Sequence, residues 1–247
     1  MKAFFSVSCL VLTAAIYSAL SWADDPPPVV YLSFDNDMND AGPYQLKSEV
    51  HGDEVSRGPG IKGKALFVGG TEDWLDIIMD EAIFLEGGSS FEVWFRREDW
   101  TNPYAGGSGF QSLVSISGSL ILYITAIACP VAPPWTLVAT VSYPLSGVQG
   151  RDVIRAYTEP DVVAANRWIH GAVTYDQQEQ SLTVYMNGEE VDRAYGVPAP
   201  SFRRRVIRVG TWFKANQAFR GYLDELKIYD YPLSPDAIRK SARANIK

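Results

Sequence analysis

The sequence is divided into many short apolar runs, and this pattern limits the fold more than any other feature. The runs are rich in β-branched and aromatic residues, and Gly, Pro, Asn and Asp separate them. Such runs predict β-strands bounded by turns, and no long segment shows the apolar period of a helix. The predicted strands are residues 29–34, 64–68, 74–78, 90–96, 112–116, 120–127, 136–142, 153–158, 168–175, 182–186, 206–213 and 222–229.

Several of these predicted strands carry apolar residues on both faces. In the strand over residues 90–96, Phe91, Val93 and Phe95 share one side and Trp94 lies on the other, because successive side chains of a strand alternate. Strands that are covered on both sides fit a sandwich of two sheets better than a thin open sheet.

Two hairpin turns and one helix can also be predicted. Residues 176–180 form a polar stretch between two predicted strands, and Asn187-Gly188 is a strong hairpin signal because both residues accept a positive φ. Ser234 can cap a helix that covers about residues 237–244, close to the end of the chain.

The first 23 residues predict a secretion signal. Lys2 is followed by an apolar run over residues 3–20 and by a small-residue cleavage site. The alternative is a membrane anchor, but the run is short for a span, and no later stretch could cross a membrane. We therefore expect a signal peptide over residues 1–23, a Pro-rich leader over 24–28, a single domain over 29–247, and a secreted or periplasmic location.

The chain is acidic, with 22 basic and 29 acidic side chains and a net charge of −7. This charge, without any long basic tract, argues against nucleic acid and anionic membranes as partners. Only Cys129 remains after the predicted cleavage, so no internal disulfide can form, and the fold must depend on its core or on a metal.

Asp224 is an unusual residue in the last predicted strand. Simple alternation places it on the same face as the core residues Leu226 and Ile228. A buried and unpaired carboxylate is too unfavourable to keep, so Asp224 needs a partner. Backbone amides or Arg220 could supply it.

The order of six sequence motifs carries a family resemblance. The motifs are YLSFDNDMNDAGPY, GPGIKGKALFVGG, SFEVWFRRE, NRWIHGAVTYDQQEQSLTVYMNGEEV, VIRVGTWF and FRGYLDELKIYDYPLSPDAI. This series, over residues 29–238, resembles the laminin G-like, concanavalin A-like lectin/glucanase superfamily in its bacterial, exported form. The resemblance implies an all-β fold, a jelly-roll sandwich of two antiparallel sheets with a short C-terminal helix.

The same resemblance offers a metal as the partner of Asp224. Members of this superfamily often hold a structural calcium where the first and last strands meet. The resemblance would make Asp35 and Asp224 its ligands, together with backbone carbonyl groups, a set of oxygen donors that suits calcium. Calcium and the hydrogen-bonded alternative both stay open at this point.

Catalytic motifs are not evident in the sequence. Glucanases of this fold carry two carboxylates in a Glu-x-Asp-x-x-Glu or similar pattern, and the nearest fragment, Glu159-Pro160-Asp161, lacks the third acid. His51 and His170 are the only histidines, too few for a zinc site of histidines. These observations favour a non-catalytic protein, and a glycan-degrading hydrolase or lyase of the same fold is the alternative.

A binding role fits the sequence better. Sugars are held by aromatic faces and a few polar groups, and Trp100, Tyr104 and Trp135 lie in predicted loops. The two tryptophans could instead plug the edge of the sandwich. We expect an exported, non-catalytic module that binds a glycan or a cell-surface glycoprotein, and a structural adhesion or envelope protein that binds another protein is a further alternative.

Overall fold

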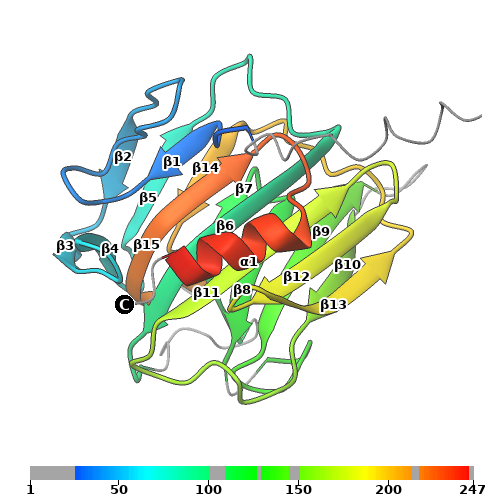
Figure 1. Cartoon of the computed structure of the whole chain (residues 1–247). Helices are drawn as coiled ribbons and strands as arrows, with labels where there is room; N and C mark the ends of the chain where they lie inside the picture. The colour runs from blue at the N-terminus through cyan, green and yellow to red at the C-terminus, as the bar shows by residue number, and fades with distance from the viewer. Residues whose placement is uncertain (1–25, 101–108, 127–128, 145–150, 213–216, 245–247) are drawn as a thin grey trace, which may run out of the picture.

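The part of the chain that the structure describes folds into two packed β-sheets with one α-helix, as a computed structural model shows (Figure 1). The structure describes residues 26–100, 109–126, 129–144, 151–212 and 217–244. The predicted signal peptide over residues 1–23 lies outside the described residues, and so does Tyr104. The elements are β1 (Val30–Leu32), β2 (Ser48–His51), β3 (Val55–Pro59), β4 (Lys64–Gly69), β5 (Trp74–Ile78), β6 (Gly88–Arg97), β7 (Phe110–Ile116), β8 (Leu120–Thr125), β9 (Leu137–Pro144), β10 (Arg151–Tyr157), β11 (Ile169–Asp176), β12 (Ser181–Met186), β13 (Glu189–Tyr195), β14 (Val206–Val209), β15 (Arg220–Tyr229) and α1 (Pro235–Ala244).

The two sheets are antiparallel at every recorded strand pairing. Sheet A has the order β13-β12-β11-β6-β15-β4-β3, and β1 also pairs with β15. Sheet B has the order β10-β9-β8-β7-β14-β5-β2. The first and last strands are thus neighbours, as expected, and the predicted two-sheet antiparallel sandwich is confirmed.

The core lies between the sheets and follows the alternation of side chains along each strand. In β6, Phe91, Val93 and Phe95 are fully buried in this core, whereas Glu92 and Trp94 point to the opposite face of sheet A. Leu122 of β8 and Val209 of β14 contribute to the same core from sheet B. Glu92 and Trp94 are only 1% and 3% exposed, so the outer face of sheet A is covered as well.

Helix α1 supplies this second cover. It lies across the outer face of sheet A (Figure 1), and its buried Ile238 packs with Ala172, Tyr185 and Tyr229. The Ser234 hydroxyl accepts a hydrogen bond from the Ala237 amide at 3.2 Å, which caps the helix as predicted. No helix in the described part of the chain has the length and apolar character needed to cross a bilayer.

Most predicted strands are present, and both predicted hairpins are confirmed. Asn187 and Gly188 connect β12 and β13 with φ values of 52° and 86°. The strand predicted over residues 206–213 ends at Val209, because Gly210 takes a φ of 95°. Sequence reasoning missed three polar strands at or near the sheet edges: β2, β3 and β13.

The placement of Asp224 on the core face was wrong. Glu225 has a φ of 48°, and the pairing of β15 with β6 shifts register between Asp224 and Lys227. This β-bulge adds one residue and resets the alternation. Leu223 and Leu226 both point into the core, while Asp224 pairs with Trp94 on the outer face.

Candidate functional site

A polar pocket lies where the β2–β3 and β4–β5 turns meet the end of β6 and the start of β15. Its volume is about 480 Å³. We call it the Trp100 pocket, and it is lined by Gly52, Asp53, Glu54, Gly69, Thr71, Glu72, Asp73, Trp100 and Arg220. Four turn carboxylates, one guanidinium and one large aromatic side chain thus come together from four distant parts of the sequence.

Glycines in the two turns let these groups approach closely. Gly52 has a φ of 86°, and a Cβ there would lie only 2.1 Å from Asp73 Oδ1. Gly70 has a φ of 111°, and a Cβ there would lie 2.9 Å from Cη2 of Trp100. Asp73 Oδ1 accepts the Glu54 amide at 2.9 Å, so the two turns are fixed against each other and against the indole ring.

The pocket has an excess of negative charge. The Arg220 guanidinium pairs with Glu54 at 2.9 Å and with Glu98 at 2.8 Å. Asp73 is only 7% exposed, and burial raises the pKa of its carboxyl group, with further increases from the charges of Glu54 and Asp53. The pocket therefore favours a ligand that brings hydrogen-bond donors or positive charge.

Trp135, the other predicted tryptophan contact within the described residues, lies elsewhere. It is half-buried and packs against the main core, and the Arg97 guanidinium carbon lies 3.7 Å from the centroid of its ring. Arg97 is held there by a 2.8 Å hydrogen bond to the Val163 carbonyl group. The structure thus brings Trp100 into the pocket and does not place Trp135 in its lining.

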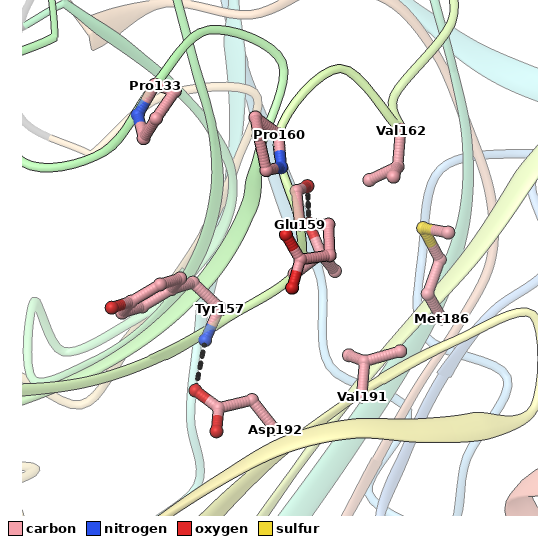
Figure 2. Close-up of a pocket in the computed structure, with 9 residues that line it drawn as sticks. Pro133, Tyr157, Glu159, Pro160, Val162, Met186, Val191 and Asp192 are labelled. Atoms are coloured by element: carbon pink, nitrogen blue, oxygen red, sulfur yellow. Dashed lines mark hydrogen bonds between the residues drawn. The ribbon is translucent and has the colours of Figure 1, made fainter.

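A second pocket, which the sequence did not reveal, lies where the edges of the two sheets meet (Figure 2). It has a volume of about 510 Å³ and is lined by Pro133, Tyr157, Thr158, Glu159, Pro160, Val162, Met186, Val191 and Asp192. Asp192 Oδ2 accepts the Tyr157 amide at 3.0 Å, which links β13 to β10. Glu159 and Pro160 lie in this pocket, so the fragment that resembled part of a glucanase pattern lies on its wall.

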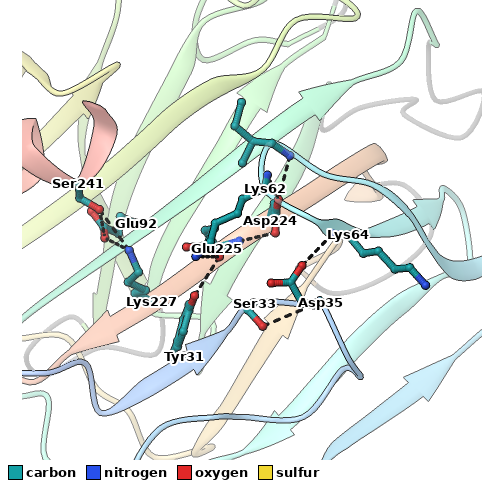
Figure 3. Close-up of polar contacts among 11 residues, drawn as sticks. Tyr31, Ser33, Asp35, Lys62, Lys64, Glu92, Asp224, Glu225, Lys227 and Ser241 are labelled. Carbon is teal, nitrogen blue, oxygen red and sulfur yellow. Dashed lines mark hydrogen bonds and ion pairs between the residues drawn. The ribbon is translucent and has the colours of Figure 1, made fainter. Parts of the chain in front are cut away.

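Asp224 binds the turn between β3 and β4, and Asp35 binds the first residue of β4, directly after that turn (Figure 3). Asp35 Oδ1 accepts the Lys64 amide at 2.9 Å. Asp224 Oδ2 accepts the amides of Ile61 at 2.9 Å and Lys62 at 3.2 Å, and its Oδ1 accepts the Glu225 amide at 2.8 Å. The two acids therefore meet through one turn, close to where the first and last strands pair.

Backbone amides are the recorded partners of Asp224, and Arg220 pairs with other acids instead. Burial is the main cause that raises the pKa of Asp224 to about 7, and the charge of Glu225 adds to this effect. Glu225 itself is 3% exposed and accepts the Tyr31 hydroxyl at 2.9 Å. Lys62 Nζ lies 3.7 Å from Glu225, and the Lys62 side chain is exposed. The cation beside these two buried acids is thus in contact with solvent.

Glu92 is the centre of a buried polar cluster under α1 (Figure 3). Its Oε1 accepts Ser241 Oγ at 2.6 Å, Lys227 Nζ at 3.1 Å and the Tyr229 hydroxyl at 3.3 Å. His170 Nε2 lies 3.3 Å from Glu92 Oε2. Burial alone would raise the pKa of Glu92, but His170, Lys227 and Ser241 outweigh it and lower the pKa to about 2.

Two packed antiparallel sheets with loop-built pockets define a jelly-roll sandwich. The laminin G-like model of the concanavalin A-like lectin/glucanases superfamily matches residues 69–239. The chain belongs to this superfamily, and the resemblance seen in the sequence motifs is confirmed. Its sequence has no match among curated proteins.

Solved structures with this fold include toxin binding domains. The binding domain of Paraclostridial Mosquitocidal Protein 1 has a TM-score of 0.70 and 15% identity, over 88% of this chain and 52% of that one. The botulinum neurotoxin DC binding domain in complex with SialylT has a TM-score of 0.66 and 14% identity, over 90% and 52%. The botulinum neurotoxin serotype D ligand binding domain in complex with N-acetylneuraminic acid has a TM-score of 0.67 and 13% identity, over 88% and 51%.

The chain spans about half the length of these toxin domains. At such low identity the likeness shows the fold and does not transfer a binding site.

Proposed function

We propose that the protein is an exported, non-catalytic glycan-binding module, and that the Trp100 pocket is its binding site. The superfamily supports a role in recognition, and two of the structural neighbours were solved with sialylated or sialic acid ligands. The secretion signal predicted over residues 1–23 supports export.

The observation that carries the proposal is the pairing of an aromatic ring with polar groups in one pocket. Trp100 offers an apolar ring against which a sugar can stack, and Thr71, Glu72 and Asp73 offer oxygen acceptors for sugar hydroxyl groups. Concave sites with an aromatic wall and a few placed polar groups are the usual form of small-ligand sites. Tyr104 follows Trp100 by four residues, and it stays a predicted contact.

Replacing Trp100 by Ala is expected to weaken glycan binding at least about tenfold, since loss of an anchoring aromatic contact costs about 1.4 kcal/mol or more. Glycan array screening of the whole chain would identify a ligand, and calorimetric titration would then give the two affinities. Trp135→Ala, measured in the same way, tests the other predicted aromatic contact.

Tyr195→Ala provides the matched control. Tyr195 is an aromatic residue that is 67% exposed, and it lies on β13 at the opposite edge of sheet A from β3. This variant should bind like the parent chain. Unchanged glycan retention in Trp100→Ala would contradict the site, and release of reducing ends or unsaturated products from a glycan would contradict the non-catalytic role.

We also propose that Asp35 and Asp224 help to hold a structural calcium ion. Two buried acids, Asp224 and Glu225, lie beside one exposed lysine, Lys62, so this region can accept a cation. The ligands would be the two aspartate carboxylates and backbone carbonyl groups. The described residues contain no group of three or more His, Cys, Asp or Glu side chains that could hold a metal, so main-chain oxygens would have to complete the site.

Chelation is expected to lower the melting temperature of the purified chain by several degrees, because an ion bound only to the native state stabilises it by mass action. Thermal melts with and without EDTA measure the shift, and added calcium should restore the original melting temperature. An Asp35→Asn variant should show a smaller EDTA shift. An identical melt in EDTA, together with no calcium by elemental analysis, would rule out the ion.

A further inference from the structure

The lining of the Trp100 pocket has a strong charge asymmetry. Four carboxylates, those of Asp53, Glu54, Glu72 and Asp73, face a single guanidinium, that of Arg220. Arg220 is paired with Glu54 and with Glu98, which lies outside the lining. No ion pair is recorded for the other three lining acids within the described ranges, so the lining keeps a net negative charge.

Asp73 is the acid that is best placed to discriminate between ligands by their charge. It lines the pocket although it is only 7% exposed. One of its carboxylate oxygens accepts the Glu54 amide at 2.9 Å, and in the described part of the chain no hydrogen bond is recorded for the other oxygen, Oδ2. Gly69 lets the Glu54 and Asp73 carboxylates both lie against the backbone here, since a Cβ there would lie 2.2 Å from Glu54 Oε2 and 3.0 Å from Asp73 Oδ2.

The indole ring of Trp100 also favours a positively charged ligand. The face of an aromatic ring is negative and attracts cations, most strongly in tryptophan. An ammonium group in this pocket would therefore interact favourably with the ring and with the carboxylates. A carboxylate in the same place would be repelled by Asp53, Glu72 and Asp73.

We propose that the Trp100 pocket selects glycans that carry a protonated amino group, accepts neutral glycans less tightly, and rejects glycans that carry a carboxylate. This inference rests on the proposed function and names its substrate class. It separates the chain from its structural neighbours that were solved with sialylated ligands or N-acetylneuraminic acid, because sialic acid carries a carboxylate.

Calorimetric titration with matched tetrasaccharides tests the selectivity. The probes are β-1,4-linked glucosamine, β-1,4-linked N-acetylglucosamine and α-1,4-linked galacturonic acid tetramers, with sialyllactose as a second carboxylated sugar. At slightly acidic pH and low salt, we expect the glucosamine tetramer to bind at least about tenfold more tightly than either carboxylated sugar. The difference should shrink as salt is added, since ions screen exposed charges.

Variants distinguish an effect of the charges in the pocket lining from an effect of the net negative charge of the chain. Asp53→Asn combined with Glu72→Gln removes two exposed lining charges and should abolish most of the preference, since one unit charge about 4 Å away is worth about fivefold in water. Glu81→Gln removes an equivalent exposed charge outside the lining and should leave the preference unchanged. Trp100→Ala should weaken binding of both the amino and the N-acetyl tetramers, and that of the amino tetramer more, because the ring also attracts the ammonium group.

Each result has a definite meaning. Equal or tighter binding of the carboxylated sugars would overturn the charge selectivity while glycan binding itself stands. A preference that the double variant does not reduce, or that Glu81→Gln reduces equally, would show that net charge, and not the pocket, attracts the amino sugar, and would also overturn it. Failure of every probe, together with an empty glycan array, would overturn the proposed function and this inference with it.

Discussion

Replacing Glu92 by Gln is expected to lower the free energy of unfolding at pH 7 by about 3 kcal/mol, near the lower end for breaking a buried ion pair. Glu92 is 1% exposed and accepts hydrogen bonds from Lys227, Tyr229 and Ser241, with His170 Nε2 at 3.3 Å from its second oxygen. A neutral amide would leave the Lys227 ammonium, whose side chain is 19% exposed, without its counter-charge. Urea unfolding of the two proteins measures the difference.

The pH dependence gives an independent check on Glu92. Its pKa is lowered from 4.5 to about 2 in the folded chain, so the unfolded chain binds more protons in this range. The stabilisation is therefore present above about pH 4.5 and is lost as the pH falls towards 2, by about 3 kcal/mol in total. Glu92→Gln should lack this part of the acid sensitivity.

Ser241→Ala is the control for the Glu92 prediction. It removes one donor from the same cluster and keeps the ion pair, so it should cost only about 1 kcal/mol. If Glu92→Gln unfolds within about 0.5 kcal/mol of the parent chain, a range typical of surface changes, the cluster does not stabilise the packing of α1 on sheet A.

Replacing Asp224 by Ala is the second change with a large expected effect, a loss of about 3 kcal/mol in the free energy of unfolding. The side chain is fully buried and accepts three backbone amides, those of Ile61, Lys62 and Glu225. A buried donor left without an acceptor costs about 1–3 kcal/mol, and we expect the β3–β4 turn to recover part of this by contact with water.

The Asp224 measurement should be made in EDTA, so that the amide hydrogen bonds are separated from any bound calcium. Asp35→Ala is the matched control, because Asp35 accepts a single exposed amide, that of Lys64, and should cost about 1 kcal/mol. Equal effects of the two variants would mean that the three amides do not depend on Asp224.

Protonation of Asp224 has the opposite pH dependence to that of Glu92. Its pKa is raised from 3.8 to about 7, so the folded chain binds more protons than the unfolded chain between these values. The contribution of Asp224 to stability is therefore full below about pH 4 and decreases as the pH rises through 7. Asp224→Ala should remove this decrease.

The fold could be predicted from sequence because its strands carry strong local signals. Residues such as Phe91, Val93 and Phe95 alternate clearly, and Asn187-Gly188 fixes a hairpin. The three missed strands have little apolar surface: β2 reads Ser-Glu-Val-His, and β13 begins with two glutamates. Such polar strands are stabilised by pairing with a neighbour, which a local pattern does not reveal.

The candidate site could be predicted only in part, because most of its residues form no local sequence motif. Trp100 was recognisable as an aromatic residue in a loop. Asp53, Glu54, Glu72 and Asp73 are typical turn residues, and only tertiary packing brings them to Trp100. The bulge at Glu225 was equally hidden, and without it simple alternation places Asp224 on the wrong face.

The position of β15 has a consequence for the order in which the molecule can be assembled. This strand follows all the other described strands in the sequence, yet it lies in the middle of sheet A and connects β6 on one side with β4 and β1 on the other. Until it leaves the ribosome, sheet A consists of three separate parts, which are β6 with β11–β13, the β3–β4 pair, and β1. Pairings so distant in sequence form slowly. A chain that we propose is exported would thereby stay incompletely folded during synthesis. In that state it can pass through a secretion channel.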